Sequence, residues 1–213
     1  TRIDFNLSAD EPIGSAYLYL DSQVGNNSLG FYNPGSGLVV SYHFDNDSAF
    51  GENGTRVYDF SGMQNNGTAI NGVVMNASGK IRGAGSFDGV NDGVNATYVN
   101  ITNNITVSAW VFSSNYLKNM FIVEKAPVNT QWQLFFESGN VLRWRGGGLA
   151  STLDCTSPAN NQWHHVVGTQ NGTTAGLFID GVQCNTGSVV AIGNGGGSVW
   201  VGSIDAESGG GYY

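Results

Sequence analysis

The sequence predicts an all-β fold, an antiparallel sandwich or jelly roll, from three observations. Short runs of alternating or apolar residues recur along the 213 residues. No stretch repeats apolar residues every three or four positions, as a long amphipathic helix would. Asn, Gly and Asp separate the runs, a pattern typical of antiparallel strands joined by tight turns.

The predicted strands follow one another with turn residues between them. They cover 2–7, 16–20, 38–44, 56–60, 83–87, 105–112, 120–125, 132–137, 141–145, 163–170, 176–180 and 198–203. Asn-Gly and Asp-Gly pairs supply the positive φ angles of tight hairpins. The pair Asp180-Gly181 lies between two short runs and gives the clearest predicted hairpin, so Asp180 is interpreted as a turn residue and not a catalyst.

Residues 1–36 differ from the rest of the chain. Ile3, Phe5 and Leu7 alternate with polar residues, and a second short run follows a Glu11-Pro12 turn. Two strands cannot bury a core alone. This segment therefore pairs with the main sheet, belongs to a neighbouring domain, or pairs with another molecule. The run 33–37 is the expected boundary between an N-terminal β segment with its linker, 1–36, and the main domain, 37–213.

Composition indicates an extracellular or cell-surface protein. Only 11% of residues are charged and the net charge is −8, so the surface depends on Asn, Ser, Thr and Gly for solubility. The acidic charge argues against nucleic acid as a partner and disfavours anionic membranes, because both require clustered Lys and Arg. No apolar run is long enough to span a membrane. The absence of an initial methionine and of a signal core suggests a mature or excised fragment.

Cys155 and Cys184 are the only cysteines, and a secreted protein would join them in a disulfide. Two buried thiols are the alternative. Asn-x-Ser/Thr triplets are about twice as frequent as composition predicts, which indicates an N-glycosylated protein. They begin at Asn6, Asn26, Asn46, Asn53, Asn66, Asn76, Asn95, Asn100, Asn104 and Asn171. The alternative is that these triplets are simply good turn and strand sequences.

From Gly37 onward the order of motifs resembles the laminin-G-like (LamG-3) branch of the concanavalin A-like lectin/glucanase superfamily, found in bacterial and archaeal surface proteins. The motifs include GLVVSYHFD (37–45), GKIRGAGSFDGVNDGV (79–94), ITVSAWVF (105–112), QLFFESGNVLRWR (133–145), NNQWHHVVGTQNG (160–172) and GLFIDGVQC (176–184). The resemblance implies two stacked antiparallel sheets, one concave, with ligands on the rim or the concave face. It also implies that Phe87 packs inside while Asp88 and Asn91 form their own turn.

The sequence departs from this family at two places. The family closes with a strand that pairs with its first strand, whereas this sequence ends at GGGYY, and an unpaired sheet edge is expected. Either the closing strand is truncated from this sequence, or another strand fills that edge. The strand at 2–7 is a candidate, in its own molecule or in a neighbour. The residue after Asp92 is usually aromatic in the family but is Gly93 here.

Catalysis is not predicted. Glucanases that share the fold carry their carboxylates as E-x-D-x-x-E on one strand, and this sequence has no such run. His43, His164 and His165 are not accompanied by a G-x-S-x-G nucleophile motif. In the family the W-H-H-V strand is structural, with Trp163 in the core and the histidines hydrogen-bonded within the sheet.

Calcium is the expected cofactor, if any, because loop carboxylates supply the hard oxygen ligands that Ca²⁺ prefers. The candidates are Asp45, Asp47 and Glu52 in one loop, and Asp88 and Asp92 in another. Sugar binding would use exposed aromatic, amide and basic side chains. The candidates are Tyr116, Asn115, Asn119, Gln131, Trp132, Arg143, Arg145, Tyr212 and Tyr213.

Side chains alternate between the two faces of a strand, and this alternation predicts which of them point into the core. Leu142 and Trp144 should point inward, and Arg143 and Arg145 outward. Trp110 and Trp200 are expected in the core.

These observations predict a non-enzymatic extracellular module for adhesion that recognises a glycan or a cell-surface protein. A structural subunit of a surface layer or filament, self-associating through an unpaired sheet edge, is the alternative. A carbohydrate-active enzyme ranks third.

Overall fold

The structure is a computed structural model that describes residues 37–76, 78–99, 101, 104–125, 131–148, 150–193 and 197–202. The predicted strands at 2–7 and 16–20 and the boundary at 36 lie outside these residues. The described part is all-β, as predicted, with a single 3-10 turn, η2 (Ser48–Phe50), and none of its helices could cross a membrane.

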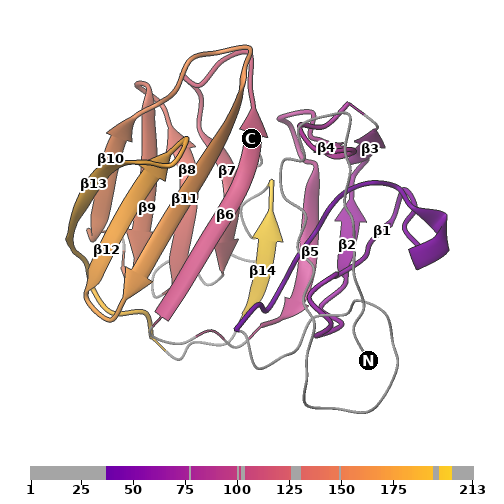
Figure 1. Ribbon diagram of the computed structural model, residues 1–213, viewed down its shortest axis with the longest axis horizontal. Helices are drawn as coiled ribbons and strands as arrows, with labels where there is room; N and C mark the ends of the chain where they lie inside the picture. The colour runs from indigo at the N-terminus through magenta and orange to yellow at the C-terminus, as the bar shows by residue number, and fades with distance from the viewer. Residues whose placement is uncertain are drawn as a thin grey trace, which may run out of the picture.

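The larger of two main sheets has eight antiparallel strands. Its spatial order is β1 (Arg56–Val57), β2 (Gly67–Ile70), β5 (Gly93–Tyr98), β14 (Ser198–Val201), β7 (Met120–Lys125), β8 (Trp132–Glu137), β9 (Val141–Gly146) and β10 (Thr152–Thr156). In Figure 1 the strands β7 to β10 form the rear layer, and β1, β2 and β5 extend this sheet to the right.

The smaller sheet has four antiparallel strands and packs face to face against the larger one. Its order is β13 (Val182–Ser188), β12 (Thr174–Ile179), β11 (Trp163–Asn171) and β6 (Asn104–Phe112). It forms the front layer of Figure 1, and a separate hairpin of β3 (Val74–Asn76) and β4 (Ala84–Ser86) lies at the upper right. The predicted two-layer sandwich is confirmed.

The main core lies between the two sheets and follows the alternation of the strands. Leu142 and Trp144 of β9 are fully buried, whereas Arg143 and Arg145 point outward, as predicted. On the opposing strand β11 the inward positions include Gly168, and a Cβ there would lie only 2.3 Å from the Trp144 ring. Glycine therefore makes room for the largest core side chain.

A second, smaller core lies under β1, β2 and β5. It is built from Val57, Ala69, Val73, Met75 and Val94, with Phe44 and Phe87 packed against it. The inward packing predicted for Phe87 is therefore found, although the ring is only partly buried.

The acidic turn that follows Phe87 is held by its own backbone. Asp88 Oδ1 accepts hydrogen bonds from the Val90 and Asn91 amides, at 2.8 and 3.2 Å. These bonds to backbone amides, the Val90 bond foremost, lower the pKa of the Asp88 carboxyl. Asp88 is thus a turn-forming residue, as predicted.

Two further sequence predictions are confirmed in the smaller sheet. Asp180 and Gly181 both have positive φ, 51° and 79°, as a tight hairpin between β12 and β13 requires. Cys155 on β10 and Cys184 on β13 form a disulfide between the two sheets.

Strand β6 is an edge strand among the described strands, whereas the unpaired edge expected beside the first strand of the domain stays a prediction. Its inward residues Val107, Ala109 and Val111 are only half-buried. The strand predicted at 38–44 is not found. These residues form only one isolated bridge, from Tyr42 to Asp59. Their backbone is held by both backbone and side-chain bonds: the Ser41 carbonyl accepts the Phe60 amide at 2.8 Å, and Asp59 Oδ1 accepts the Ser41 amide at 2.9 Å.

Candidate ligand-binding surface

The outer face of the four-stranded sheet carries exposed aromatic side chains. On β6 the residues Ile105, Val107, Ala109 and Val111 point inward, so the residues between them point out. The register with β11 places His165 opposite Trp110 and Trp163 opposite Phe112. We call Ser108, Trp110, Phe112, Trp163 and His165 the outer strip.

The rings of the outer strip lie against one another in pairs. The ring centroids of Trp110 and His165 are 5.2 Å apart, and those of Phe112 and Trp163 are 5.6 Å apart. Trp110 remains 38% exposed and Phe112 51% exposed. A run of neighbouring large apolar side chains left open to solvent is the kind of feature that marks a binding surface.

Polar groups accompany these rings. Ser108 Oγ and His165 Nε2 are 2.9 Å apart and share a hydrogen bond on the same face. Lys80, from the turn between β3 and β4, holds its Nζ 5.1 Å from the centroid of the Trp110 ring. The strip therefore combines flat apolar surface with a hydroxyl, an imidazole and an ammonium group, a mixture suited to a ligand with both apolar and polar faces.

The sequence-based prediction that Trp110 and Trp163 lie in the core is wrong. Alternation with the smaller residues Val107, Ala109 and Val111 places Trp110 outside, and strand pairing carries the same parity to Trp163. Trp200 is buried, as predicted. The missed signal was the regular small apolar series on β6, which already occupies the inward positions.

His164 and Asp180 stabilise the strip from below. His164 points inward and its Nδ1 lies 2.7 Å from Asp180 Oδ2, while Asp180 Oδ1 accepts the His165 backbone amide at 2.9 Å. Burial opposes ionisation of Asp180, but the hydrogen bonds from His164 and the His165 amide prevail and lower its pKa. Ser108 and Asp180 contact different imidazole rings, so they do not form a Ser-His-Asp triad with either histidine.

The outer face of the eight-stranded sheet carries a polar array instead. Arg145 donates to Gln133 Oε1 at 2.6 Å, and Gln133 donates to Glu124 Oε2 at 2.6 Å. The Arg145 guanidinium also lies over the Phe135 ring, 5.0 Å from its centroid. Gln133, Glu124 and Phe135 are almost fully buried.

Arg143 completes this array. It makes a two-pronged contact with Asp154, at 2.6 Å for each bond, and also pairs with Glu137. The hydrogen bonds to Asp154 raise the pKa of Arg143, whereas burial lowers that of Arg145. Arg143 and Arg145 do point outward, as predicted. Their guanidinium groups bond Asp154, Glu137 and Gln133 within the array, although the buried Nε of Arg145 has no hydrogen-bond partner among the described residues.

Several predicted ligand residues are buried. Tyr116, Gln131 and Trp132 are 1%, 1% and 2% exposed, so their predicted exposure is wrong. The Tyr116 ring packs 4.3 Å from that of Phe136, and Trp132 stacks on Trp144 in the core.

Of the other predicted sugar-binding residues, two hydrogen-bond the backbone of loops and two lie outside the described residues. Asn115 Oδ1 accepts the Leu117 amide, and Asn119 Oδ1 accepts the Ser138 amide, so both amide side chains hold loop backbone. Tyr212 and Tyr213 lie outside the described residues.

The predicted calcium ligands in the first loop are occupied by backbone amides. Asp45 Oδ1 accepts the Gly83 amide, Asp47 Oδ1 accepts the Ala49 amide, and Glu52 accepts the amides of Asp47 and Tyr58. No group of three or more metal-binding side chains gathers within the described part of the chain. In this loop each of the three carboxylates already holds backbone, and calcium binding by them stays a prediction from the sequence.

Asp92 in the second loop is different. Its Oδ2 accepts the Asp88 amide at 2.9 Å, but its Oδ1 is buried and has no hydrogen-bond donor among the residues that the structure describes. One open carboxylate oxygen fits a cation or a water, although neighbouring Asp88 uses its Oδ1 for its own turn.

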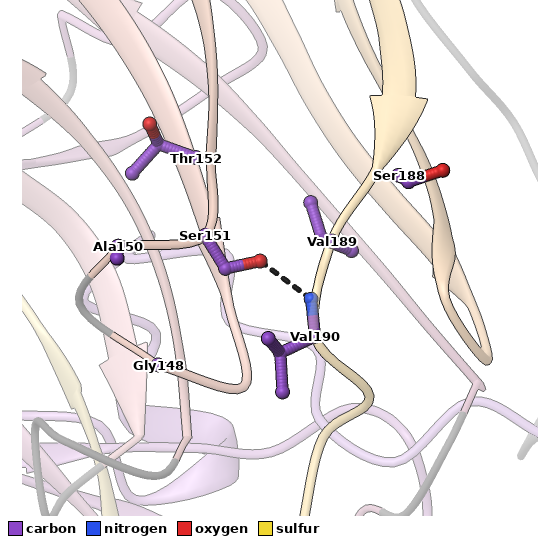
Figure 2. Close-up of a pocket in the computed structure, with 7 residues that line it drawn as sticks. All are labelled: Gly148, Ala150, Ser151, Thr152, Ser188, Val189 and Val190. Atoms are coloured by element: carbon purple, nitrogen blue, oxygen red, sulfur yellow. Dashed lines mark hydrogen bonds between the residues drawn. The ribbon is translucent and has the colours of Figure 1, made fainter.

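A shallow hollow lies at the other end of the smaller sheet, between the β9–β10 loop and the end of β13. It has a volume of about 480 Å³ and is lined by Gly148, Ala150, Ser151, Thr152, Ser188, Val189 and Val190. Figure 2 shows Ser151 Oγ accepting the Val190 amide, at 2.5 Å, across this hollow. Its lining contains neither an aromatic nor a charged side chain, so it offers little for recognition.

Four of the predicted glycosylation triplets start at exposed asparagines, Asn46, Asn53, Asn104 and Asn171. Asn66 and Asn95 are half-buried, and Asn66 Oδ1 accepts the Asp59 amide. Asn76 ends β3, and its side chain is not among those described; Asn6, Asn26 and Asn100 lie outside the described residues. Occupancy at every position stays a prediction.

Solved structures with this architecture include carbohydrate-binding domains. Domain 4 of AbnA, a GH43 extracellular arabinanase from Geobacillus stearothermophilus solved in complex with arabinotriose, is 16% identical with a TM-score of 0.60, over 82% of this chain and 85% of that one. A botulinum neurotoxin type C structure, described as dependent on two ganglioside molecules for cell entry, is 17% identical with a TM-score of 0.53, over 77% of this chain. The chain spans only 42% of that toxin chain.

At such identities the likeness shows the fold alone. No curated protein matches the sequence. The family model described as the concanavalin A-like lectin/glucanases superfamily matches residues 88–212, more than half of the chain. Together with the two-sheet architecture, this match shows that the chain belongs to the concanavalin A-like lectin/glucanases superfamily, in its laminin-G-like branch.

Proposed function

We propose that this domain is a non-enzymatic, extracellular glycan-binding module, and that it binds sugar on the outer strip. One observation carries the proposal: Trp110 and Phe112 stay exposed side by side on a sheet face, next to the hydrogen-bonded pair of Ser108 and His165.

A pyranose ring has an apolar C–H face and a rim of hydroxyl groups. The Trp110 ring supplies a flat apolar surface for the first, and Ser108 and His165 supply donors and acceptors for the second. Because the strip lies on paired strands of a sheet, its side chains are held in place before a ligand arrives. Such preorganisation lowers the entropic cost of binding.

Other features support the same function. Domain 4 of AbnA is in complex with arabinotriose, and the botulinum neurotoxin DC binding domain is in complex with SialylT. The disulfide is typical of proteins that work in an oxidising, extracellular environment. These facts favour recognition of sugars outside the cell, for adhesion to a surface.

A glycan array followed by titration tests the proposal. We expect Trp110→Ala to weaken binding by about tenfold or more, because it removes the stacking surface. Its fold should persist, since Trp110 is exposed. Val190→Ala is a matched control, because Val190 is 55% exposed and lies near Thr173, at the opposite end of β11 from Trp163. Equal binding by Trp110→Ala and the parent protein would contradict the assignment of the site.

A structural role in a surface layer or filament is the second candidate. Strand β6 ends its sheet among the described strands, and its inward residues Val107, Ala109 and Val111 are half-buried. An incoming strand could pair with this edge and cover them. Light scattering of the intact chain from 1 to 200 μM tests this candidate, and a constant monomer mass counts against it.

Catalysis is the third candidate, because the superfamily includes glucanases. Incubation with β-glucans and an assay for new reducing ends tests it. Release of reducing ends above a heat-inactivated control would overturn the non-enzymatic proposal.

A further inference from the structure

We propose that the glycan bound by the outer strip is acidic, and that Lys80 contacts its carboxylate or sulfate group. This inference rests on the proposed function and specifies its ligand class. It starts from the distribution of charge around the strip, which differs from that of the chain as a whole.

The chain is acidic, with 16 Asp and Glu against 8 Lys and Arg. The outward face of β6 and β11 does not share this character. Its positions, given by the register of the two strands, are Asn104, Thr106, Ser108, Trp110, Phe112, Trp163, His165, Val167, Thr169 and Asn171. None of them is a carboxylate, so an anionic ligand meets no repulsion from these ten side chains.

Lys80 brings a basic group to this face, with its Nζ 5.1 Å from the centroid of the Trp110 ring. Arg82, two residues along the same turn, is paired with Asp45 at 3.4 Å. Among the described residues no carboxylate pairs with Lys80 in this way. Its positive charge is therefore available to a ligand.

The contact between Lys80 and Trp110 is weak enough to give way to a ligand. A cation over an exposed aromatic ring is worth about 0.5–1 kcal/mol. The lysine stem is flexible and its ammonium has three donors, so it can leave the indole and bind an anionic group on a sugar stacked there. The Trp110 ring then serves as the stacking surface for the sugar, while Lys80 selects ligands that carry a negative charge.

One carboxylate beside the strip, that of Asp180, is already bonded to groups of the protein. Asp180 contacts the strip only through the His165 backbone amide, and its other oxygen bonds His164 Nδ1. Both of its oxygens are therefore directed to protein donors. Ser108 and His165 remain on the surface to bond the hydroxyl groups of the sugar.

Two pairs of polymers, each matched in backbone, test the inference by affinity gel electrophoresis of the full chain. Polygalacturonate is compared with its methyl ester, and dextran sulfate with dextran. We expect the acidic member of at least one pair to bind ten times more tightly than its neutral partner. The pair that responds tells carboxylate from sulfate. Raising NaCl from 0.05 to 0.5 M should weaken that binding, because salt screens exposed charges.

Lys80→Met should remove this preference, whereas Arg56→Met removes one positive charge on β1 and should leave it intact. Both residues are exposed, so melting curves should match those of the parent protein. Equal binding of both members of each pair, or an unchanged preference in Lys80→Met, would overturn the inference while leaving the proposed function standing. Binding to none of the four polymers would also overturn it. The proposed function fails separately, if the wider glycan array is blank.

Discussion

Cys155 and Cys184 join β10, at one edge of the eight-stranded sheet, to β13, at the corresponding edge of the four-stranded sheet. The bridge closes the sandwich on this side covalently. On the other side of the smaller sheet, β6 has no such link among the described residues.

Loss of the disulfide should therefore be costly. The two cysteines are 29 residues apart, and closing a loop of that length is worth about 3–4 kcal/mol in the chain-entropy view. We expect the double variant Cys155→Ala, Cys184→Ala to melt about 10 °C lower than the oxidised protein. Reducing agent should lower the Tm of the parent protein similarly and leave the double variant unchanged. A Tm that does not respond to either change would contradict the bridge.

Gly168 should not tolerate a side chain. A Cβ at this position would lie 2.3 Å from the buried Trp144 ring, and overpacking of a core of this kind costs about 1–3 kcal/mol. Gly168→Ala is expected to lower the Tm by several degrees. Gly148→Ala is the control, because a Cβ there meets nothing within 4 Å. Equal melting temperatures of the two variants would show that Trp144 does not pack on β11.

The pairing of Asp180 with His164 predicts an acid-sensitive contribution to stability. The pKa of Asp180 is lowered in the folded state, so its contribution is present above the unfolded value of about 3.9 and is lost as pH falls through the folded pKa. Asp180→Asn keeps a residue type that tolerates the positive φ at this position. The gap in Tm between the parent protein and Asp180→Asn should narrow as pH falls from 5 to 2. A gap that stays constant over this range would contradict the contribution of the Asp180 carboxylate.

Calcium remains a prediction from the sequence, and the structure suggests where to test it. Asp47 is engaged as the cap of η2, whereas Asp92 Oδ1 is buried and bonds no donor in the described part of the chain. Melting curves in CaCl₂ and in EDTA measure any stabilisation by the ion. We expect a calcium-dependent rise in Tm to survive in Asp47→Asn and to disappear in Asp92→Asn. A calcium effect that disappears in Asp47→Asn and survives in Asp92→Asn would instead place the calcium site in the loop of Asp45, Asp47 and Glu52.

The fold was predictable because its main determinants are local. Alternation along β9 assigned Leu142 and Trp144 to the core and Arg143 to the surface, and the Asp180-Gly181 turn fixed a hairpin. The binding surface was harder to predict, because the last four residues of β6, Ala109–Phe112, are apolar on both faces. Hydrophobicity alone places Trp110 inside, and it takes the alternation with Val107, Ala109 and Val111 to show that it lies outside.

Long-range packing explains the other errors. Tyr116 lies in a polar loop, NYLKN, whose composition predicts exposure. The loop instead folds back so that the ring rests on Phe136 of β8, twenty residues away, with its amide bonded to Asn160 Oδ1. Neither contact leaves a trace in the local sequence.

The pairing of Asn104 with Asn171 at one end of β6 and β11 bears on how the protein should be produced. Both asparagines begin acceptor triplets on the face that holds Trp110, which lies six residues, about 20 Å, along the strand. A bacterial expression host without N-linked modification would yield this face bare, whereas a glycosylating host could attach branched oligosaccharides beside it. Preparations of the same polypeptide from two hosts could therefore differ in what they capture, so mass spectrometry of the sample should precede any screening.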